Sequence, residues 1–317
     1  MNFKNILITG AAGFIGSHVY DYISSIYIDA SITILDKMTY AANIKNIANL
    51  STNDKHNLVV GDLVDPDICF EATKGKDLII HLAAESHVDN SFNNSIIFSR
   101  SNTLGTHTLM EACKRNNVKK IIHFSTDEVF GENIDEPFKE EDRLNPTNPY
   151  SASKAAAEMI VNSYFYSFNL PVIIVRANNI YGIRQYPEKI IPKFITRSIK
   201  GQNLQIHGDG SHLRHYLSVK DVVTALNTII SKGQIGHSYN VSADVELSNI
   251  EVANKIKDLF PNKKINIEHV TNRPFNDSRY AVNDKKLRLL NWKPKYKLTE
   301  ELPTIIDWYS KNLNYFN

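Results

Sequence analysis

The stretch ITGAAGFIGSH, residues 8–18, decides the fold of this 317-residue chain. Gly10, Gly13 and Gly16 form a G-x-x-G-x-x-G array that follows an apolar run and precedes a segment with helical spacing. Glycine lets the backbone approach an anion closely, and the amide groups at a helix start favour a bound pyrophosphate. Three glycines also make an ordinary tight turn. The strand before them and the helix after them favour a dinucleotide site.

Apolar runs rich in Ile and Val recur along the first half of the chain. Because they lack polar alternation, we expect strands that are buried on both faces. The helical stretches between them, such as 105–117 and 151–168, predict parallel pairing with right-handed crossovers. We therefore predict an α/β fold with a doubly wound parallel sheet, a Rossmann fold. The runs cover residues 5–10, 31–36, 57–62, 77–84, 119–126 and 171–178.

The alternation of strands and helices weakens after Asn178, where Pro, Gly and Asn become frequent. We interpret residues 1–178 as a dinucleotide-binding domain, to which part of 216–245 returns. Residues 179–317 are interpreted mainly as a smaller, mixed α/β lobe that binds the substrate.

Composition excludes several classes of function. The chain has 42% hydrophobic and 22% charged residues, with 36 basic against 34 acidic side chains, so no field for nucleic acid or acidic membranes is expected. Cys69 and Cys113 have no CxxC partner and the histidines lack HExxH spacing, which predicts neither a disulfide framework nor a metal site. The first residues show no signal pattern, and no apolar run approaches ~20 residues. We expect a cytoplasmic protein.

The residues after the second and third apolar runs favour NAD as the dinucleotide. Asp36 lies twenty residues past Gly16, where a carboxylate would accept hydrogen bonds from the ribose and repel a 2'-phosphate. Lys37 could soften that repulsion. Asp62 and Leu63 could contact the adenine, although a helix cap explains Asp62 equally well.

Tyr150 and Lys154 in NPYSASKAAAEM, residues 148–159, lie four apart and hence on one face of a helix. An ammonium beside a phenol should lower the phenol's pKa, and such a tyrosine can take a proton from a hydroxyl while hydride leaves for nicotinamide. The pattern is common by chance. Its place after the glycine loop and Asp36 favours a catalytic pair.

Asp127 and Glu128 follow a predicted strand in HFSTDEVFG, residues 123–131. Ligands of open parallel sheets lie outside the carboxyl ends of the strands. For the pair alone, a cap at Asp127 and a solvent-exposed Glu128 is the simpler interpretation.

Several motifs in this order resemble the extended short-chain dehydrogenase/reductase family, and within it the nucleotide-sugar 4,6-dehydratases. They are the glycine loop, STDEVFG at 125–131, YSASK at 150–154 and NNIYG at 178–182. YPEKIIPKFI at 186–195 and HGDGSHLRHYL at 207–217 are similar to nucleotide-sugar contacts of the subfamily. NRPFNDSRY at 272–280 and HVDNSF at 87–92 resemble the dehydratase lobe of plant-type UDP-rhamnose synthases more than bacterial dTDP-glucose dehydratases.

The resemblance implies roles for the residues. Thr126 would hold the sugar C4 hydroxyl near Tyr150, Asp127 would be the acid, and Glu128 the base. The implied cofactor contacts are Gly10, Gly13, Phe14, Ile15, Gly16, Asp36, Lys37, Asp62, Leu63, Leu82, Ala83, Ala84, Ser86, Ser101, Tyr150 and Lys154. The implied substrate contacts are Ser86, His87, Thr126, Asn179, Lys189, Ile190, Gln205, His207, Arg214, Asn249, Arg273 and Asn276.

Some of these assignments keep alternatives open. Asn102 matches a helix asparagine of the family but is as readily a satisfied core amide. Asn249 and Arg273 are as readily surface polar groups. His215 and Tyr216 replace the Asp and Trp or Phe that are common after the arginine in the bacterial pattern, which leaves the register of the loop around Arg214 open. The helices 99–117 and 151–168 match a two-fold four-helix interface, which implies a homodimer, or they cover the sheet of a monomer.

Three functions remain in competition. The first is an NAD-dependent nucleotide-glucose 4,6-dehydratase, with UDP-glucose ahead of dTDP-glucose. The second is a 4-epimerase or decarboxylase on the same scaffold, which would not need both carboxylates. The third is a catalytically silent dinucleotide-binding protein, in which losses among Thr126, Asp127, Glu128, Tyr150 or Lys154 would be expected, and none is lost.

Overall fold

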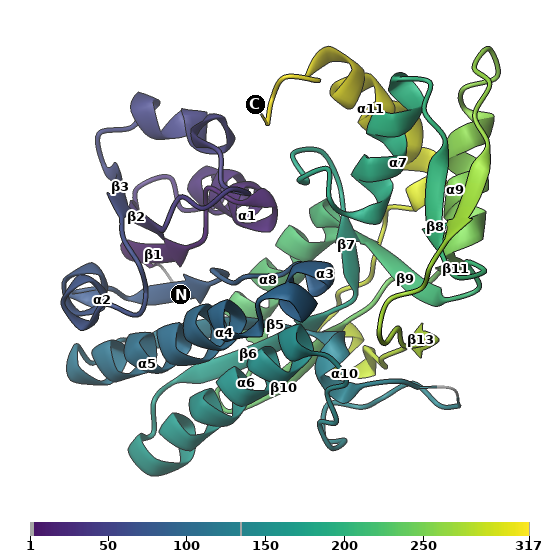
Figure 1. Ribbon diagram of the computed structural model, residues 1–317. Helices are drawn as coiled ribbons and strands as arrows, with labels where there is room; N and C mark the ends of the chain where they lie inside the picture. Colours follow the sequence, from purple (N-terminus) through teal and green to yellow (C-terminus); the bar gives the residue numbers. More distant parts are fainter. Residues whose placement is uncertain (1–2, 134, 317) are drawn as a thin grey trace.

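A seven-stranded parallel sheet forms the centre of the computed structural model, which describes residues 3–133 and 135–316 (Figure 1). The strand order is β10-β6-β5-β4-β1-β2-β3, so the direction of winding changes between β1 and β4. This confirms the predicted doubly wound fold. The strands are β1 (Asn5–Thr9), β2 (Ser31–Asp36), β3 (His56–Val60), β4 (Leu78–His81), β5 (Lys120–Thr126), β6 (Val172–Ala177) and β10 (Ser238–Val241).

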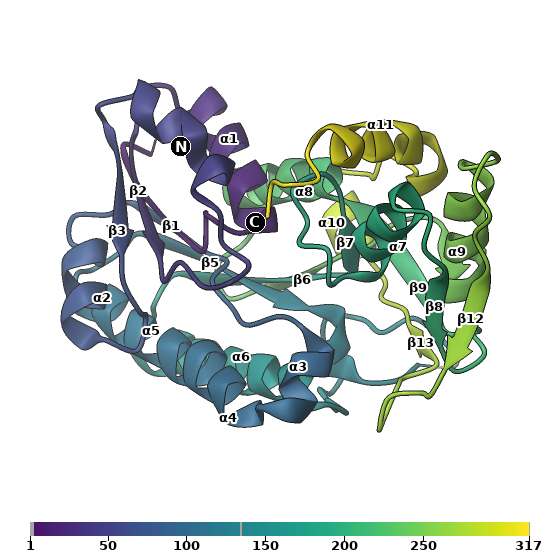
Figure 2. The same cartoon turned by 45° about the horizontal axis from the view of Figure 1, so that its top comes forward.

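Helices cover both faces of this sheet (Figure 2). Successive strand residues alternate between the two cores: Ile6 and Ile8 pack with α1 and α8, whereas Leu7 packs with α2, α5 and α6. A strand that is apolar at every position therefore reflects burial on both sides. These helices are α1 (Phe14–Ile26), α8 (Val219–Lys232), α2 (Pro66–Thr73), α5 (Gly105–Arg115) and α6 (Pro149–Phe168).

A smaller lobe has its own core, built around Tyr181, Phe194 and Leu204. It contains a four-stranded sheet and a two-stranded sheet. The strands are β7 (Asn179–Tyr181), β9 (Leu213–Ser218), β11 (Glu246–Ser248) and β13 (Arg279–Tyr280), with the pair β8 (Leu204–His207) and β12 (Ile267–Val270). The helices are α7 (Ile190–Ile199), α9 (Asn249–Asp258) and α11 (Leu298–Lys311).

The chain passes between the two parts more than once. After β9 in the smaller lobe, α8 packs on the large sheet and β10 pairs with β6, before β11 pairs with β9. The exact division into two domains stays a prediction. The remaining short elements are η1 (Ile44–Thr52), α3 (Val88–Asn93), α4 (Ser95–Phe98), the π-helix η2 (Ser99–Leu104), η3 (Asp127–Phe130) and α10 (Lys285–Arg288). Across 3–133 and 135–316, no helix is both long and apolar enough to cross a bilayer.

Candidate active site

A cavity of about 390 Å³ lies where the carboxyl ends of the large sheet meet the smaller lobe. Parallel sheets place ligands at this edge, where the strand order changes direction. The lining comes from the glycine loop, from segments after β2, β3, β4, β5 and β6, from the start of α6, and from residues 185–191, 214–216 and 273–280.

Glycines let the backbone of this loop pack closely on itself and on the segment after β4. Gly10 has φ +74°, and a Cβ there would lie 2.7 Å from the backbone of Ala83. A Cβ on Gly16 would lie 2.1 Å from the carbonyl oxygen of Gly10. Helix α1 begins at Phe14 with no side chain capping its free amide groups. The tight turn thus brings the uncapped start of α1 to the cavity wall, and N–H groups at a helix start fit the pyrophosphate of a dinucleotide.

Asp36 ends β2 as a buried carboxylate at the cavity wall. It accepts hydrogen bonds from the backbone amides of Ala12 (2.9 Å) and Met38 (2.8 Å), and burial raises its pKa. The ammonium of Lys37 lies 2.7 Å from Asp62 and is thereby neutralised beside Asp36. The helix-cap interpretation of Asp62 is wrong, because Asp65 caps α2.

Asp127 and Glu128 both line the cavity, and Thr126 rather than Asp127 caps the short helix η3. Asp127 is buried and accepts hydrogen bonds from the Thr126 hydroxyl (3.2 Å) and from Asn178 Nδ2 (2.7 Å). Burial, together with the neighbouring Glu128, raises the pKa of Asp127 to about 7. The cap-and-surface interpretation of this pair is therefore wrong.

Glu128 has a different environment from its neighbour. It accepts a hydrogen bond from Asn148 Nδ2 at 3.2 Å. Burial raises the pKa of Glu128, but the cations Lys189 and Arg214 act in the opposite direction. The charge of Arg214 also lowers the pKa of Asp127, but it contributes less than burial, Glu128 and the hydrogen bonds from Asn178 and Thr126. Two adjacent carboxyl groups with different surroundings can hold different protonation states, as acid and base catalysis requires.

Tyr150 and Lys154 lie on one face of α6 and both line the cavity. Lys154 Nζ donates a hydrogen bond to the carbonyl oxygen of Phe124 at 2.8 Å, and burial lowers the pKa of Lys154 to about 8. Burial, with a contribution from Glu128, raises the pKa of Tyr150. The expected lowering of the phenol's pKa by the ammonium is therefore wrong for the protein alone, because desolvation dominates.

Cations gather on the side of the cavity formed by the smaller lobe. Lys189 donates to the carbonyl oxygen of Ser86 at 2.6 Å. Arg214 donates to the carbonyl oxygen of Asp277 at 2.8 Å and stacks 4.3 Å from the ring centre of Tyr280. Arg273 pairs with Asp89 at 2.5 Å. Guanidinium and ammonium groups in such a place can bind a diphosphate.

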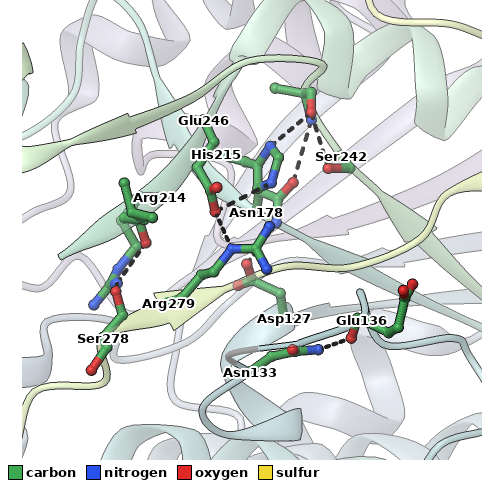
Figure 3. A network of polar contacts seen from close by, with 12 residues as sticks. Asp127, Asn133, Glu136, Asn178, Arg214, His215, Ser242, Glu246, Ser278 and Arg279 are labelled. Atoms are coloured by element: carbon green, nitrogen blue, oxygen red, sulfur yellow. Dashed lines mark hydrogen bonds and ion pairs between the residues drawn. The ribbon is translucent and has the colours of Figure 1, made fainter.

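The register around Arg214 follows from strand alternation in β9. Arg214 and Tyr216 line the cavity, and the Tyr216 hydroxyl donates to Asn249 Oδ1 at 3.1 Å. His215 lies on the opposite face, near Glu246 (Figure 3).

Most of the predicted site residues share this cavity. Two do not: Gln205 and His207 lie outside its lining. Their strand β8 pairs with β12, and His207 Nδ1 contacts the carbonyl oxygen of Thr271. Their role as substrate contacts is not supported by this placement.

Three further residues of the site, for which the sequence predicts no role, hold its carboxyl and hydroxyl groups. Asn148 and Asn178 donate to Glu128 and Asp127, and Asp277 accepts from the hydroxyls of Thr147 and Tyr280. The motifs contain all three, but nothing in their local pattern shows which carboxyl or hydroxyl group they meet.

Asn102 is a satisfied core amide. It donates to the Glu85 carbonyl oxygen and the Ser153 hydroxyl, both at 2.9 Å, and accepts from the Glu85 amide at 2.8 Å. In the part of the chain that the structure describes, no three His, Cys, Asp or Glu side chains are grouped to hold a metal ion.

Comparison with known proteins gives the family. Residues 7–304 match the family model described as GDP-mannose 4,6 dehydratase. The chain belongs to this family. The resemblance to nucleotide-sugar 4,6-dehydratases is thus confirmed.

Curated relatives of this family member include a trifunctional UDP-glucose 4,6-dehydratase, epimerase and reductase of Arabidopsis thaliana. It is 46% identical over 316 residues, which cover 98% of this chain and 47% of the relative. The dTDP-D-glucose 4,6-dehydratase of Dictyostelium discoideum is 42% identical, over 99% of this chain and 83% of that protein. The chain spans about half the length of the Arabidopsis relatives.

A solved relative is the dTDP-glucose 4,6-dehydratase DesIV of Streptomyces venezuelae, crystallised with NAD bound. The TM-score is 0.94 at 32% identity, with 98% of both chains covered. A UDP-glucose 4-epimerase of Thermotoga maritima superposes with a TM-score of 0.89 at 26% identity. Because both activities occur on this fold, the site has to distinguish them.

Proposed function

We propose that the chain catalyses the 4,6-dehydration of a nucleotide-activated glucose to the 4-keto-6-deoxy sugar. The observation that carries the proposal is the pair Asp127 and Glu128. The two carboxyl groups are adjacent, line one cavity with Tyr150, and have different partners and surroundings. A 4-epimerase needs the tyrosine but has no use for a second carboxyl group.

The residues divide the chemistry among them. NAD, when bound, would accept the hydride that leaves C4, which makes C4 a ketone and the C5 proton acidic, and would return that hydride to C6 after water has left. A proton that returns to C5 completes the 4-keto-6-deoxy sugar. Thr126 holds the C4 hydroxyl, and Tyr150 takes its proton. Glu128 removes the C5 proton, while Asp127, whose pKa of about 7 leaves it partly protonated at neutral pH, gives a proton to the departing C6 oxygen.

NAD rather than NADP fits the dinucleotide half of the cavity. The carboxylate of Asp36 lines this half of the cavity and would repel a 2'-phosphate, and Lys37 is paired with Asp62. The solved dehydratases of Streptomyces venezuelae and Bacillus anthracis, both crystallised with NAD, support this assignment. Purified protein should carry about one equivalent of NAD, since the cofactor ends each cycle as it began. Protein that is free of NAD after dialysis and accumulates NADH in stoichiometric amounts would contradict it.

UDP-glucose is our preferred substrate over dTDP-glucose. The motifs at 87–92 and 272–280 and the Arabidopsis relatives support UDP, whereas the Dictyostelium relative carries a dTDP-glucose name. Turnover of both substrates should be compared, with the sugar product identified by NMR. We expect a 4-keto-6-deoxy sugar and a higher kcat/KM for UDP-glucose. A 4-epimer as product would identify an epimerase instead, and a higher kcat/KM for dTDP-glucose would reverse the preference.

A homodimer formed through α6 and the helices beside it is the assembly that we propose. Large apolar side chains are exposed along α4, η2 and α6, namely Ile96, Ile97, Leu104, Met159, Tyr166 and Phe168. The helices pack side by side in Figures 1 and 2, so a two-fold partner could cover this surface with the same helices. The cytoplasmic location stays a prediction from the sequence.

A further inference from the structure

Asn178 is fixed between the proposed acid and the backbone that follows β10. Its Nδ2 lies 2.7 Å from Asp127 Oδ2, and its Oδ1 lies 3.3 Å from the backbone nitrogen of Ala243. A backbone N–H can only donate, so the atom that faces Ala243 must be the amide oxygen. The NH2 group therefore faces Asp127 and can only donate to it.

We propose that Asn178 is a positioning residue, which holds Asp127 in place and directs its acidic proton to Oδ1. The oxygen that accepts from Asn178 behaves as the carbonyl oxygen of a neutral carboxyl group, because a hydroxyl oxygen is the poorer acceptor. The proton then resides on Oδ1, 3.2 Å from the Thr126 hydroxyl, which donates to Oδ1 when the carboxyl group is charged and can turn to accept from it when the group is neutral. The use of this proton to release the C6 oxygen rests on the proposed function.

A polar cluster outside the cavity holds the backbone that orients Asn178 (Figure 3). The carbonyl oxygen of Ala243 contacts His215 Nδ1 at 2.9 Å and accepts from the Ser242 hydroxyl at 3.1 Å. His215 lies 3.6 Å from Glu246, which pairs with Arg279 at 2.8 Å. His215, which departs from the bacterial pattern, therefore helps to hold the backbone at Ala243.

The charges around Asp127 determine the direction of the expected change. Glu128 raises its pKa, whereas the hydrogen bonds from Asn178 and Thr126 and the charge of Arg214 lower it. The charge of Asp127 also acts on Tyr150, whose pKa it raises. Removal of the Asn178 amide takes away a donor that stabilises the charged form, so the pKa of Asp127 must rise.

The test is a direct titration of Asp127 in the full chain with its cofactor. Isotope-edited infrared spectra, with Asp127→Asn as the blank, follow the carboxyl band of wild type and of Asn178→Ala. We expect the midpoint to rise by about one pH unit in Asn178→Ala, the usual size of one hydrogen bond to a charged group. In turnover, kcat should fall about tenfold or more with little change in KM. The alkaline limb of the pH–rate profile should move to higher pH by the same amount as the midpoint, about one pH unit.

Asn240→Ala is the matched control. Asn240 is buried on β10 and donates to the carbonyl oxygens of Phe138 and Asn283, outside the cavity lining. The Asn240→Ala protein should be less stable than wild type, but the titration midpoint of Asp127 should stay the same.

A second variant keeps the test decisive if Asn178→Ala fails to fold. Asn178→Asp retains an acceptor for Ala243 but places a second carboxyl group against Asp127, so the pair should share a proton and the midpoint should rise further. An unchanged midpoint in both variants, or an equal shift in Asn240→Ala, would overturn the role of Asn178. A wild-type protein that makes no 4-keto-6-deoxy sugar would instead contradict the proposed function, while the titration still tests Asn178.

Discussion

Asn148 Nδ2 lies 3.2 Å from Glu128 Oε2, and Oδ1 of the same asparagine accepts the backbone N–H of Ser151 at 2.9 Å. One side chain thus caps α6 and holds the proposed base. Because α6 also carries Tyr150 and Lys154, the base and the tyrosine keep a fixed relation to each other.

Asn148→Ala should therefore reduce both stability and turnover. Loss of the cap should lower the free energy of unfolding by about 1 kcal/mol. Asn148→Ser restores a good cap but has no amide to reach Glu128, so it should recover stability in urea denaturation while kcat stays low. Full activity in the serine variant would show that Asn148 acts only as a cap.

Asp127→Asn should stabilise the protein while it slows water loss. The pKa of Asp127 is about 7 when folded, above its ordinary value of 3.8, so the folded state favours the neutral form. The contribution of Asp127 to stability is therefore fully present below about pH 4 and is lost as the pH rises through about 7. We expect Asp127→Asn to exceed wild type by about 1–3 kcal/mol at about pH 8, and by less at about pH 5, in urea denaturation.

Asp77→Asn is the control for this pH dependence. Hydrogen bonding to Lys119 lowers the pKa of Asp77, so its contribution to stability is lost only as the pH falls below its ordinary pKa. The difference in the free energy of unfolding between Asp77→Asn and wild type should be the same at about pH 5 and about pH 8. If the stability difference between Asp127→Asn and wild type does not grow with pH, the raised pKa of Asp127 is contradicted.

Gly16→Ala should remove the bound dinucleotide. The added Cβ would lie 2.1 Å from the Gly10 carbonyl oxygen and 2.7 Å from Ala11 Cα, both of which are backbone atoms that cannot move aside. We expect the free energy of unfolding to fall by about 1–3 kcal/mol, and the purified protein to carry little NAD. Gly201→Ala is the control, because the added Cβ meets no other atom and only the φ of +67° is unfavourable. It should lower the free energy of unfolding by about 1 kcal/mol and leave the NAD content unchanged. Equal NAD content in both variants would contradict the assigned site.

Met159→Glu should separate the proposed dimer. Met159 is 62% exposed on α6, and a carboxylate there would be buried against the partner. Leu289→Glu is the control, because Leu289 is 83% exposed after α10 and outside the proposed interface. Light scattering should give twice the 36.0 kDa chain mass for wild type and Leu289→Glu, and the single mass for Met159→Glu. A single mass for wild type at micromolar concentrations would contradict the dimer.

The sequence predicts those parts of the site whose residues are close together both along the chain and in the folded structure. The glycine loop and Asp36 belong to one strand-helix-strand unit, and Tyr150 and Lys154 lie one helical turn apart. Asp127 and Glu128 follow a strand directly. In each case, a local pattern already determines the place of the side chain in the fold.

The rest depends on contacts between distant segments. Asn178 and Asp127 follow two neighbouring strands, β6 and β5, and are joined by a hydrogen bond. Asn148 donates a hydrogen bond to Glu128 from the far end of the loop between η3 and α6. The pKa of Tyr150 is raised because the folded chain buries it, which no local spacing shows. Gln205 lies in a motif similar to substrate contacts, but the pairing of β8 with β12 places it outside the cavity lining.

The fate of the C5 hydrogen tests the dehydratase account most directly. If Glu128 removes the C5 proton and the proton later returns from exchangeable groups, product formed in heavy water should carry deuterium at C5. NMR of the 4-keto-6-deoxy sugar measures this label position by position. We predict deuterium at C5, with the hydrogen from the substrate's C4 found at C6. A product that keeps its original hydrogen at C5 would contradict the account.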